Sequence, residues 1–267
     1  MIKKIIKRML NILGFEIRRL PSIRSNFEPT RIKMKESLQH ILSLGYYPKI
    51  IIDVGAAYGT WPLLKVFPKS RYLWIEPLIE FENALKELSG KYNGQFIIAA
   101  AGKFNGATSI KVTPYLFGGS LCYDKLDNSS LREIEIIRLN GLIKKYDLRD
   151  DILLKVDVEG YELEVLEGAQ ELLQGCEVVI LEVSLFRYTK EHPDFYDVID
   201  YMKKRKFVVY DILGGHNRPL DKALAQKDIL FVKENGRFRQ AHNWATNKEL
   251  GKFCKKFKYK AGSDDDE

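Results

Sequence analysis

Apolar residues occur in two patterns that alternate along the chain. Short runs that are almost entirely apolar predict β-strands at 50–53, 72–76, 95–100, 152–156 and 178–183. Such runs are typical of strands that are buried on both faces, as in the middle of a parallel sheet. Between them, apolar residues recur at helical spacing and predict helices at 30–44, from about 60, at 78–88, at 162–173 and at 194–204.

Other apolar segments predict strands at 108–113, 134–139, 207–213 and 229–233. The alternation of strands and helices is typical of an α/β fold and predicts a doubly wound, mostly parallel sheet with helices on both faces. A chain of 267 residues, 45% of them apolar, can bury one sizeable core. We expect one main domain at 48–240, an N-terminal segment at 1–47 and an extension at 241–267 with a disordered acidic tail.

The N-terminal segment 1–20 combines an apolar stripe at helical spacing with a basic flank. Only Glu16 is acidic, whereas the basic residues are Lys3, Lys4, Lys7, Arg8, Arg18 and Arg19. A helix of this kind either packs on protein, which includes a second copy of the chain in a homodimer, or lies on an anionic membrane surface. A cleaved signal peptide is not expected, because charges interrupt every apolar run. A linker is predicted at 21–29, before the next helix.

Composition narrows the class of protein further. Cys122, Cys176 and Cys254 are far apart and odd in number, so we expect neither a disulfide framework nor a cysteine metal site, and a cytoplasmic location is favoured. No apolar run is long enough to cross a bilayer. The net charge of +7 is moderate and the lysines alternate with acids, so nucleic acid is not an expected partner.

The first predicted strand ends in a glycine-containing loop, where Asp53 is followed by Gly55 and Gly59. Glycines there allow a tight turn and a close approach of the backbone to a ligand. Glu76 ends the second predicted strand, at 76 − 53 = 23 positions after Asp53. An acid at that place is suited to accept hydrogen bonds from ribose hydroxyls, although the glycines alone could serve only the turn.

The loop lacks the Gly-x-Gly-x-x-Gly pattern of dinucleotide sites, and no P-loop motif occurs in the chain. A nucleoside cofactor without phosphates, such as S-adenosylmethionine, therefore fits better than NAD or FAD. An NAD-dependent oxidoreductase remains a less favoured alternative.

A second motif lies at 155–169, where a predicted strand enters an acidic turn and then a helix. The hexamer Lys155-Val156-Asp157-Val158-Glu159-Gly160 is followed by Glu162, Val165-Leu166 and Gly168-Ala169. Together with Asp53-Val54-Gly55-Ala56, Ile75-Glu76-Pro77 and Val179-Ile180-Leu181-Glu182, this motif resembles the FkbM-type family of S-adenosylmethionine-dependent methyltransferases.

The resemblance implies a Rossmann-like methyltransferase sheet with a late antiparallel strand, and S-adenosyl-L-methionine as cofactor. The cofactor-binding residues that it implies are Asp53, Gly55, Ala56, Tyr58, Gly59, Glu76 and Pro77. It also favours O-methylation of a sugar, a glycan or a secondary metabolite. One departure is Ala57, where the family usually has Asn; a non-catalytic cofactor- or glycan-binding protein is therefore the alternative.

Methyl transfer to a hydroxyl needs a base that takes the proton. Asp157 is the first candidate and Glu159 the second, and Lys155 would orient either of them. Both acids could instead cap the helix that follows. His192 and His216 are alternative bases.

A divalent metal on Asp157 and Glu182 is conceivable because carboxylates suit magnesium, but nothing in the sequence requires a metal. Acceptor loops are predicted at 114–130, which is rich in aromatic residues and glycine, and at 186–194.

Overall fold

The computed structural model describes residues 30–112 and 130–256, with side chains up to Phe253. The predicted helix at 1–20, the linker at 21–29, the acceptor loop at 114–130 except its last residue, and the acidic tail lie outside the described residues. The chain divides into two compact units. The larger unit, Arg31–His242, contains both sheets and the helices that cover them. In the other unit the described element is α8 (Asn247–Lys256). Phe253 of this helix packs edge-on against Trp244, which precedes the helix, with ring centroids 4.8 Å apart.

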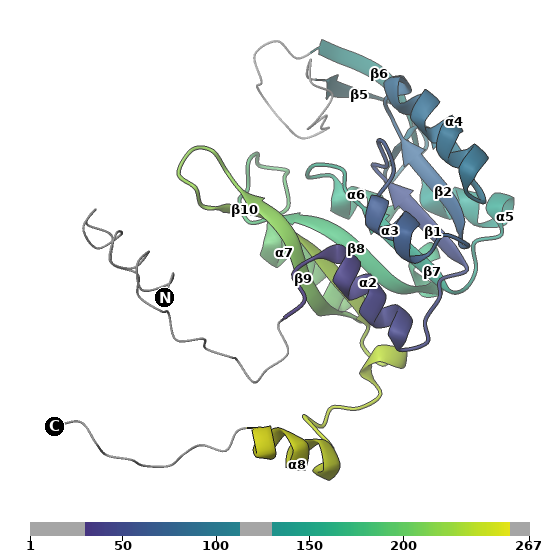
Figure 1. Cartoon of the computed structure of the whole chain (residues 1–267). Coiled ribbons are helices and arrows are strands. Elements are labelled where there is room, and N and C mark those ends of the chain that lie inside the picture. The colour runs from purple at the N-terminus through teal and green to yellow at the C-terminus, as the bar shows by residue number, and fades with distance from the viewer. Residues whose placement is uncertain (1–29, 113–129, 257–267) are drawn as a thin grey trace, which may run out of the picture. The chain divides into compact units, whose positions relative to one another are not determined.

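A seven-stranded sheet forms the centre of the larger unit, in the order β3-β2-β1-β7-β8-β10-β9 (Figure 1). Its strands are β1 (Ile50–Val54), β2 (Arg71–Glu76), β3 (Gly94–Ile98), β7 (Ile152–Val156), β8 (Cys176–Ser184), β9 (Phe207–Asn217) and β10 (Leu224–Lys233). Among the described strands of this sheet, β10 is antiparallel to both of its neighbours and the other pairs are parallel. The prediction of a mostly parallel sheet with a late antiparallel strand is confirmed.

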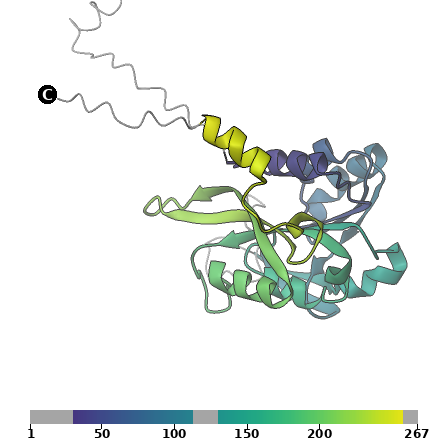
Figure 2. The same cartoon turned by 90° about the horizontal axis from the view of Figure 1, so that it is seen from below.

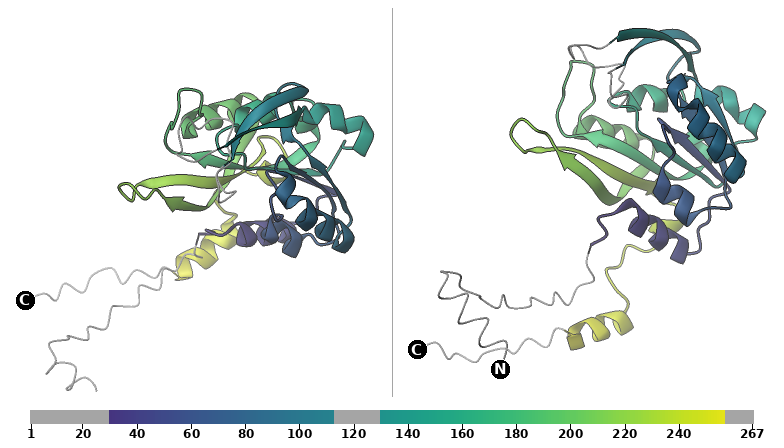
Figure 3. Two further views of the ribbon diagram at one scale, coloured as in Figure 1. Left: turned by 90° about the horizontal axis from the view of Figure 1, so that it is seen from above. Right: turned by 45° about the horizontal axis from the view of Figure 1, so that its top comes forward.

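Helices cover both faces of the sheet, as the alternation of segments predicted (Figures 2 and 3). One apolar layer contains Ile51 and Leu153 and is covered by α2 (Met34–Ser43), α3 (Trp61–Val66) and α4 (Glu82–Lys91). The opposite layer contains Ile52 and Leu154 and is covered by α5 (Ile143–Tyr146), α6 (Glu162–Glu167) and α7 (Phe195–Lys204). Successive residues of one strand therefore face opposite layers, which is why these runs are apolar throughout.

A second, three-stranded sheet lies beside the first and has the order β4-β6-β5. It comprises β4 (Ala100–Ala101), β5 (Gly106–Val112) and β6 (Ser130–Ile137). Its apolar side forms a small separate cluster with Leu78 and Phe81, in which Ile110, Ile134 and Ile136 are buried. The sequence predicted β5 and β6 as extra strands, but not that they form a sheet of their own.

The predicted elements differ from the observed ones mainly at their ends. β7 has the predicted bounds, whereas β9 and β10 are longer than predicted and form a hairpin whose tip passes the end of β8. The short helices η2 (Leu139–Leu142) and α5 were not predicted, and neither was α8. Within the described part of the chain, we find no helix of the length and apolar character that spanning a membrane requires.

The strand order reverses between β1 and β7, because β2 and β3 extend the sheet on one side and β8 to the other. Ligands of such sheets bind beyond the carboxyl ends of the strands at this reversal. Parallel pairing places Asp53 opposite Lys155 and Val54 opposite Val156. The loops that follow β1 and β7 therefore leave the sheet side by side.

Candidate functional site

The loop after β1 has a backbone that few residues other than glycine adopt. Gly55 and Gly59 have φ angles of 72° and 81°, and Ala57 between them has a φ of 44°. A Cβ atom on Gly55 would lie 1.8 Å from the carbonyl oxygen of Asp157. Glycine is therefore needed at position 55 both for the left-handed conformation and because the loops after β1 and β7 are in direct contact.

Glu76, at the end of β2, binds two backbone segments that line one cavity. One carboxylate oxygen accepts a hydrogen bond of 2.9 Å from the amide of Ala57, and the other accepts one of 3.0 Å from the amide of Leu78. Burial raises the pKa of Glu76, and these two amide donors oppose the rise. The side chain thus fixes the β1 loop relative to β2, and each oxygen retains a lone pair for a ligand.

The cavity beside Glu76 has a volume of about 360 Å³, within the range of about 300–1,000 Å³ typical of small-molecule sites. One wall is the β1 loop, from Gly55 to Thr60, and another is apolar and includes Phe81 and Ile110. The third wall is the acidic turn after β7. Of the predicted site residues, the cavity is lined by Gly55, Ala56, Tyr58, Gly59, Glu76, Pro77, Lys155, Asp157 and Glu159.

Asp53 is the predicted site residue that does not line the cavity. Its side chain is fully buried below the β1 loop, where its oxygens accept bonds of 3.0 Å from both the amide and the hydroxyl of Thr60. Burial raises the pKa of Asp53, opposed chiefly by Lys155. Asp53 therefore holds the far end of the loop, and its contact to a ligand would be indirect.

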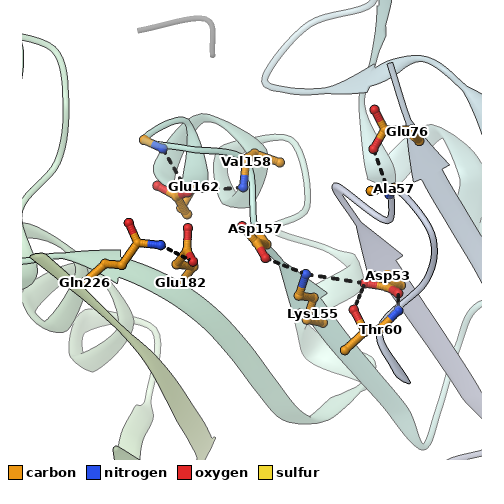
Figure 4. A network of polar contacts seen from close by, with 11 residues as sticks. Asp53, Ala57, Thr60, Glu76, Lys155, Asp157, Val158, Glu162, Glu182 and Gln226 are labelled. Atoms are coloured by element: carbon orange, nitrogen blue, oxygen red, sulfur yellow. Dashed lines mark hydrogen bonds and ion pairs between the residues drawn. The ribbon is translucent and has the colours of Figure 1, made fainter. Parts of the chain in front are cut away.

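Lys155 connects the two sides of the site (Figure 4). Its ammonium lies 2.8 Å from Asp157 and 3.7 Å from Asp53, and only 6% of its side chain is exposed. Burial alone would lower the pKa of Lys155, but the two carboxylates raise it above its usual range. Burial likewise acts to raise the pKa of Asp157, yet the adjacent Lys155 keeps it below its usual value. Lys155 and Asp157 thus form a charged pair in which the lysine is buried and 32% of the aspartate side chain is exposed.

The turn after Asp157 is held by Glu162, the first residue of α6. The buried carboxylate of Glu162 accepts hydrogen bonds from the amides of Val158, at 3.3 Å, and Gly160, at 3.0 Å. This turn places Glu159 in the left-handed region, with φ 54°, where side chains are uncommon. Burial and, secondarily, the Asp157 charge raise the pKa of Glu159 to about 7. Strain of this kind often occurs at functional sites.

Further acids from β8 and β10 approach the same turn. Oxygen atoms of Asp157, Glu159 and Glu182 all lie within 4.8 Å of one another, close enough to hold a divalent cation. Gln226 on β10 donates a hydrogen bond to Glu182 (Figure 4). Burial, followed by the charge of Asp157, raises the pKa of Glu182. Adjacent carboxylates that cannot both ionise therefore share a proton. Asp228 lies opposite Glu182 in the register of β10 and β8. Burial and the charge of Asp157 raise the pKa of Asp228 to about 6.

The histidines that rivalled the acids as bases lie in different surroundings. His192 is buried against Gly160, and burial lowers its pKa. His216 is exposed and lies within β9 rather than in a loop. The sequence missed the roles of Glu162, Gln226 and Asp228 at the site. Glu162 is part of the motif at 155–169, and its position at the start of a helix after an acidic turn is the signal that could have identified its role.

Comparison with known proteins places this geometry in context. The family described as the methyltransferase FkbM domain matches residues 53–209, which is more than half of the 267 residues. A relative, the hexuronic acid methyltransferase AglP of Haloferax volcanii, is 26% identical over 170 residues. The aligned part covers 63% of this chain and 66% of that protein, slightly less than two thirds of its length.

Solved structures with a related fold include methyltransferases of very different substrates. An rRNA methylase of Streptococcus thermophilus has 12% identity and a TM-score of 0.42, over 76% of this chain and 99% of that one. The magnesium protoporphyrin IX methyltransferase ChlM of Synechocystis PCC 6803, solved with bound SAM, has 11% identity and a TM-score of 0.39, over 86% of this chain and 96% of that one.

Proposed function

Because this chain belongs to the methyltransferase FkbM family, we propose that it transfers a methyl group from S-adenosylmethionine to a hydroxyl oxygen of a sugar. The observation that carries the proposal is the arrangement of carboxylates around one cavity. Glu76 lies at one wall, where a ribose would be recognised, and Glu159 lies at another, where a proton would be taken.

The lining of the cavity suits the chemistry of this cofactor. Ribose hydroxyls would donate to the remaining lone pairs of Glu76, and the apolar wall with Phe81 and Ile110 would receive the adenine ring. Backbone groups of the loop from Ala56 to Gly59 would face its charged amino-acid end. The cofactor, when bound, supplies an electrophilic methyl group on a sulfonium; the chain supplies binding, alignment and a base.

Of the two predicted bases, Glu159 fits that role better than Asp157. Asp157 is committed to the ammonium of Lys155 at 2.8 Å, and that pairing lowers its pKa and weakens it as a base. Glu159 has a pKa of about 7 and a strained backbone conformation. A general base works best when its pKa is near the working pH. In the proposed reaction, the acceptor oxygen would bond to the methyl carbon as the carbon–sulfur bond of the donor breaks and S-adenosylhomocysteine leaves, and Glu159 would accept the hydroxyl proton. The ion pair of Lys155 and Asp157 would hold the turn in place.

A sugar acceptor is supported by the relative whose name states its substrate as hexuronic acid. Hydroxyls are weak nucleophiles, so an acceptor of this kind needs the base that the acidic turn provides. A carboxylate, which a hexuronic acid carries beside its hydroxyls, would need no base to take its proton, so the base at the acidic turn favours a hydroxyl acceptor. We therefore propose ether formation at a hydroxyl as the reaction.

Calorimetric titration with S-adenosylhomocysteine tests the donor site. The substitution Glu76→Ala should weaken binding at least about tenfold, because buried ribose hydroxyls lose a charged acceptor. Glu80→Ala is the matched control, since Glu80 is a nearby acid that pairs with Arg132 at the surface. Thermal unfolding of both variants checks that the fold is kept. Equal affinity in Glu76→Ala and wild type, or no affinity in wild type, would refute the donor site; binding without transfer would favour the non-catalytic alternative.

A further inference from the structure

The segment between β8 and α7 carries aromatic residues next to the acidic turn, outside the cavity assigned to the donor. We propose that Tyr188 is the platform on which the sugar ring of the acceptor lies, with its reacting hydroxyl toward Glu159. This inference rests on the proposed function and names a binding surface for its second substrate. Tyr188 does not line the donor cavity, as a separate acceptor subsite requires.

Packing fixes this segment against the acidic turn. A Cβ atom on Gly160 would lie 2.2 Å from Nδ1 of His192, so the backbone after Glu159 lies directly on the histidine ring. The Tyr188 ring packs edge-on against that same histidine, with centroids 5.4 Å apart and planes at 88°. The ring of His192 thus contacts both Tyr188 and the turn that carries Glu159.

The start of the segment is anchored as well. The amide of Leu185 donates a 2.8 Å hydrogen bond to the carbonyl of Ala225 on β10. The guanidinium of Arg218, near the tip of the β9–β10 hairpin, lies 3.7 Å from the centre of the Phe186 ring. Arg218 is itself held by Asp221 through two bonds, of 2.8 and 2.6 Å. Phe186 is therefore covered by the hairpin, whereas 37% of Tyr188 remains exposed.

Charges near Tyr188 support the placement. Burial raises the pKa of its hydroxyl, Arg218 lowers it and Glu159 raises it, so the phenol lies within electrostatic range of both groups. An aromatic face binds the apolar C–H face of a pyranose, and neighbouring polar groups orient its hydroxyls. The positive charge of Arg218 is already balanced by Asp221. We therefore assign the platform to a sugar ring rather than to an anionic group.

Saturation-transfer NMR with methyl hexopyranosides as probes, in the presence of S-adenosylhomocysteine, tests the platform. Tyr188→Ala should weaken probe binding by about tenfold through loss of the stacking surface, whereas Tyr188→Phe, which keeps the ring, should retain it. Tyr196→Ala is the control, since Tyr196 is 80% exposed on α7 a few residues further on. Where turnover is measurable, Tyr188→Ala should raise KM for the pyranoside and leave kcat nearly unchanged.

Unchanged probe binding in Tyr188→Ala, or an equal loss in Tyr196→Ala, would overturn the platform. So would the absence of pyranoside binding to wild type that binds S-adenosylhomocysteine normally. Calorimetry of S-adenosylhomocysteine on the same samples separates the two proposals. If the wild type does not bind S-adenosylhomocysteine, the methyltransferase function itself is refuted. If the wild type binds it and substitution of Tyr188 does not change pyranoside binding, only the acceptor assignment is refuted.

Discussion

Replacement of Lys155 by methionine tests how the two sides of the site are held together. Methionine keeps most of the length of the side chain but removes the cation. Asp53, which is fully buried, and Asp157, whose side chain is 32% exposed, would then lack their shared positive partner. Removal of one member of a buried ion pair costs about 3–5 kcal/mol, because the remaining charge is desolvated and uncompensated. A loss of that size is a large part of the stability of a typical domain.

The matched control is Lys49→Met. Lys49 forms an ion pair with Asp151 at 3.0 Å, close to the 2.8 Å between Lys155 and Asp157, but 70% of the Lys49 side chain is exposed. Solvent screens such a pair, so its removal should change the free energy of unfolding far less. The two variants thus compare similar distances in different surroundings.

Urea denaturation at pH 7, followed by circular dichroism, gives the free energy of unfolding of each variant. The difference in the free energy of unfolding between wild type and Lys155→Met should become smaller as the pH falls from 7 toward about 4. Without the cation, the folded-state pKa of Asp53, which burial already raises, would rise further, and that of Asp157 would no longer be lowered. The folded variant therefore takes up more protons than the wild type and gains stability relative to it as the pH falls. Equal destabilisation in the two variants, or a difference that does not change with pH, would refute this account of the site.

Three further outcomes are expected. The methyl-transfer rate should rise with pH through an apparent pKa near the value of about 7 of Glu159, and Glu159→Gln should remove that rise; a flat profile from pH 6 to 8 would exclude Glu159 as the base. Gly55→Ala should lower the melting temperature more than Gly45→Ala does. Both glycines have positive φ, but only the new Cβ at position 55 would clash with the carbonyl of Asp157. Equal shifts in melting temperature would contradict the close contact. Dialysis against EDTA should leave the rate unchanged, because protons shared with Glu182 can offset the clustered charge; loss restored by magnesium would show that a metal is needed.

Much of this architecture follows from local patterns. All-apolar runs and their order predicted the strands of the central sheet, and the match of residues 53–209 to the FkbM family confirms the resemblance that the motifs carried. The sequence placed Glu76 and Asp157 at or directly after predicted strands, and in the structure both line one cavity, while Glu182 lies close to Asp157. These features depend on sequence-local properties such as burial and strand direction.

Other features depend on contacts between distant segments. The sequence located Asp53 at the end of a strand but gave no sign of its register against Lys155, which draws its side chain below the loop. Ala57 has a left-handed backbone and its amide donates a hydrogen bond to Glu76, and neither feature could be predicted from an alanine side chain. The pKa of Glu159 arises from the neighbours that the fold supplies, so the order of preference between the two candidate bases could not be predicted from residue type alone.

The contact between Gly55 and the carbonyl of Asp157 has a consequence for attempts to redesign the protein. Any replacement that shifts the backbone of the acidic turn also pushes on the loop that lines the donor cavity, so the two cannot be varied independently. Libraries aimed at new acceptors should therefore leave 157–160 intact and vary the segment after β8, which meets the turn through the ring of His192.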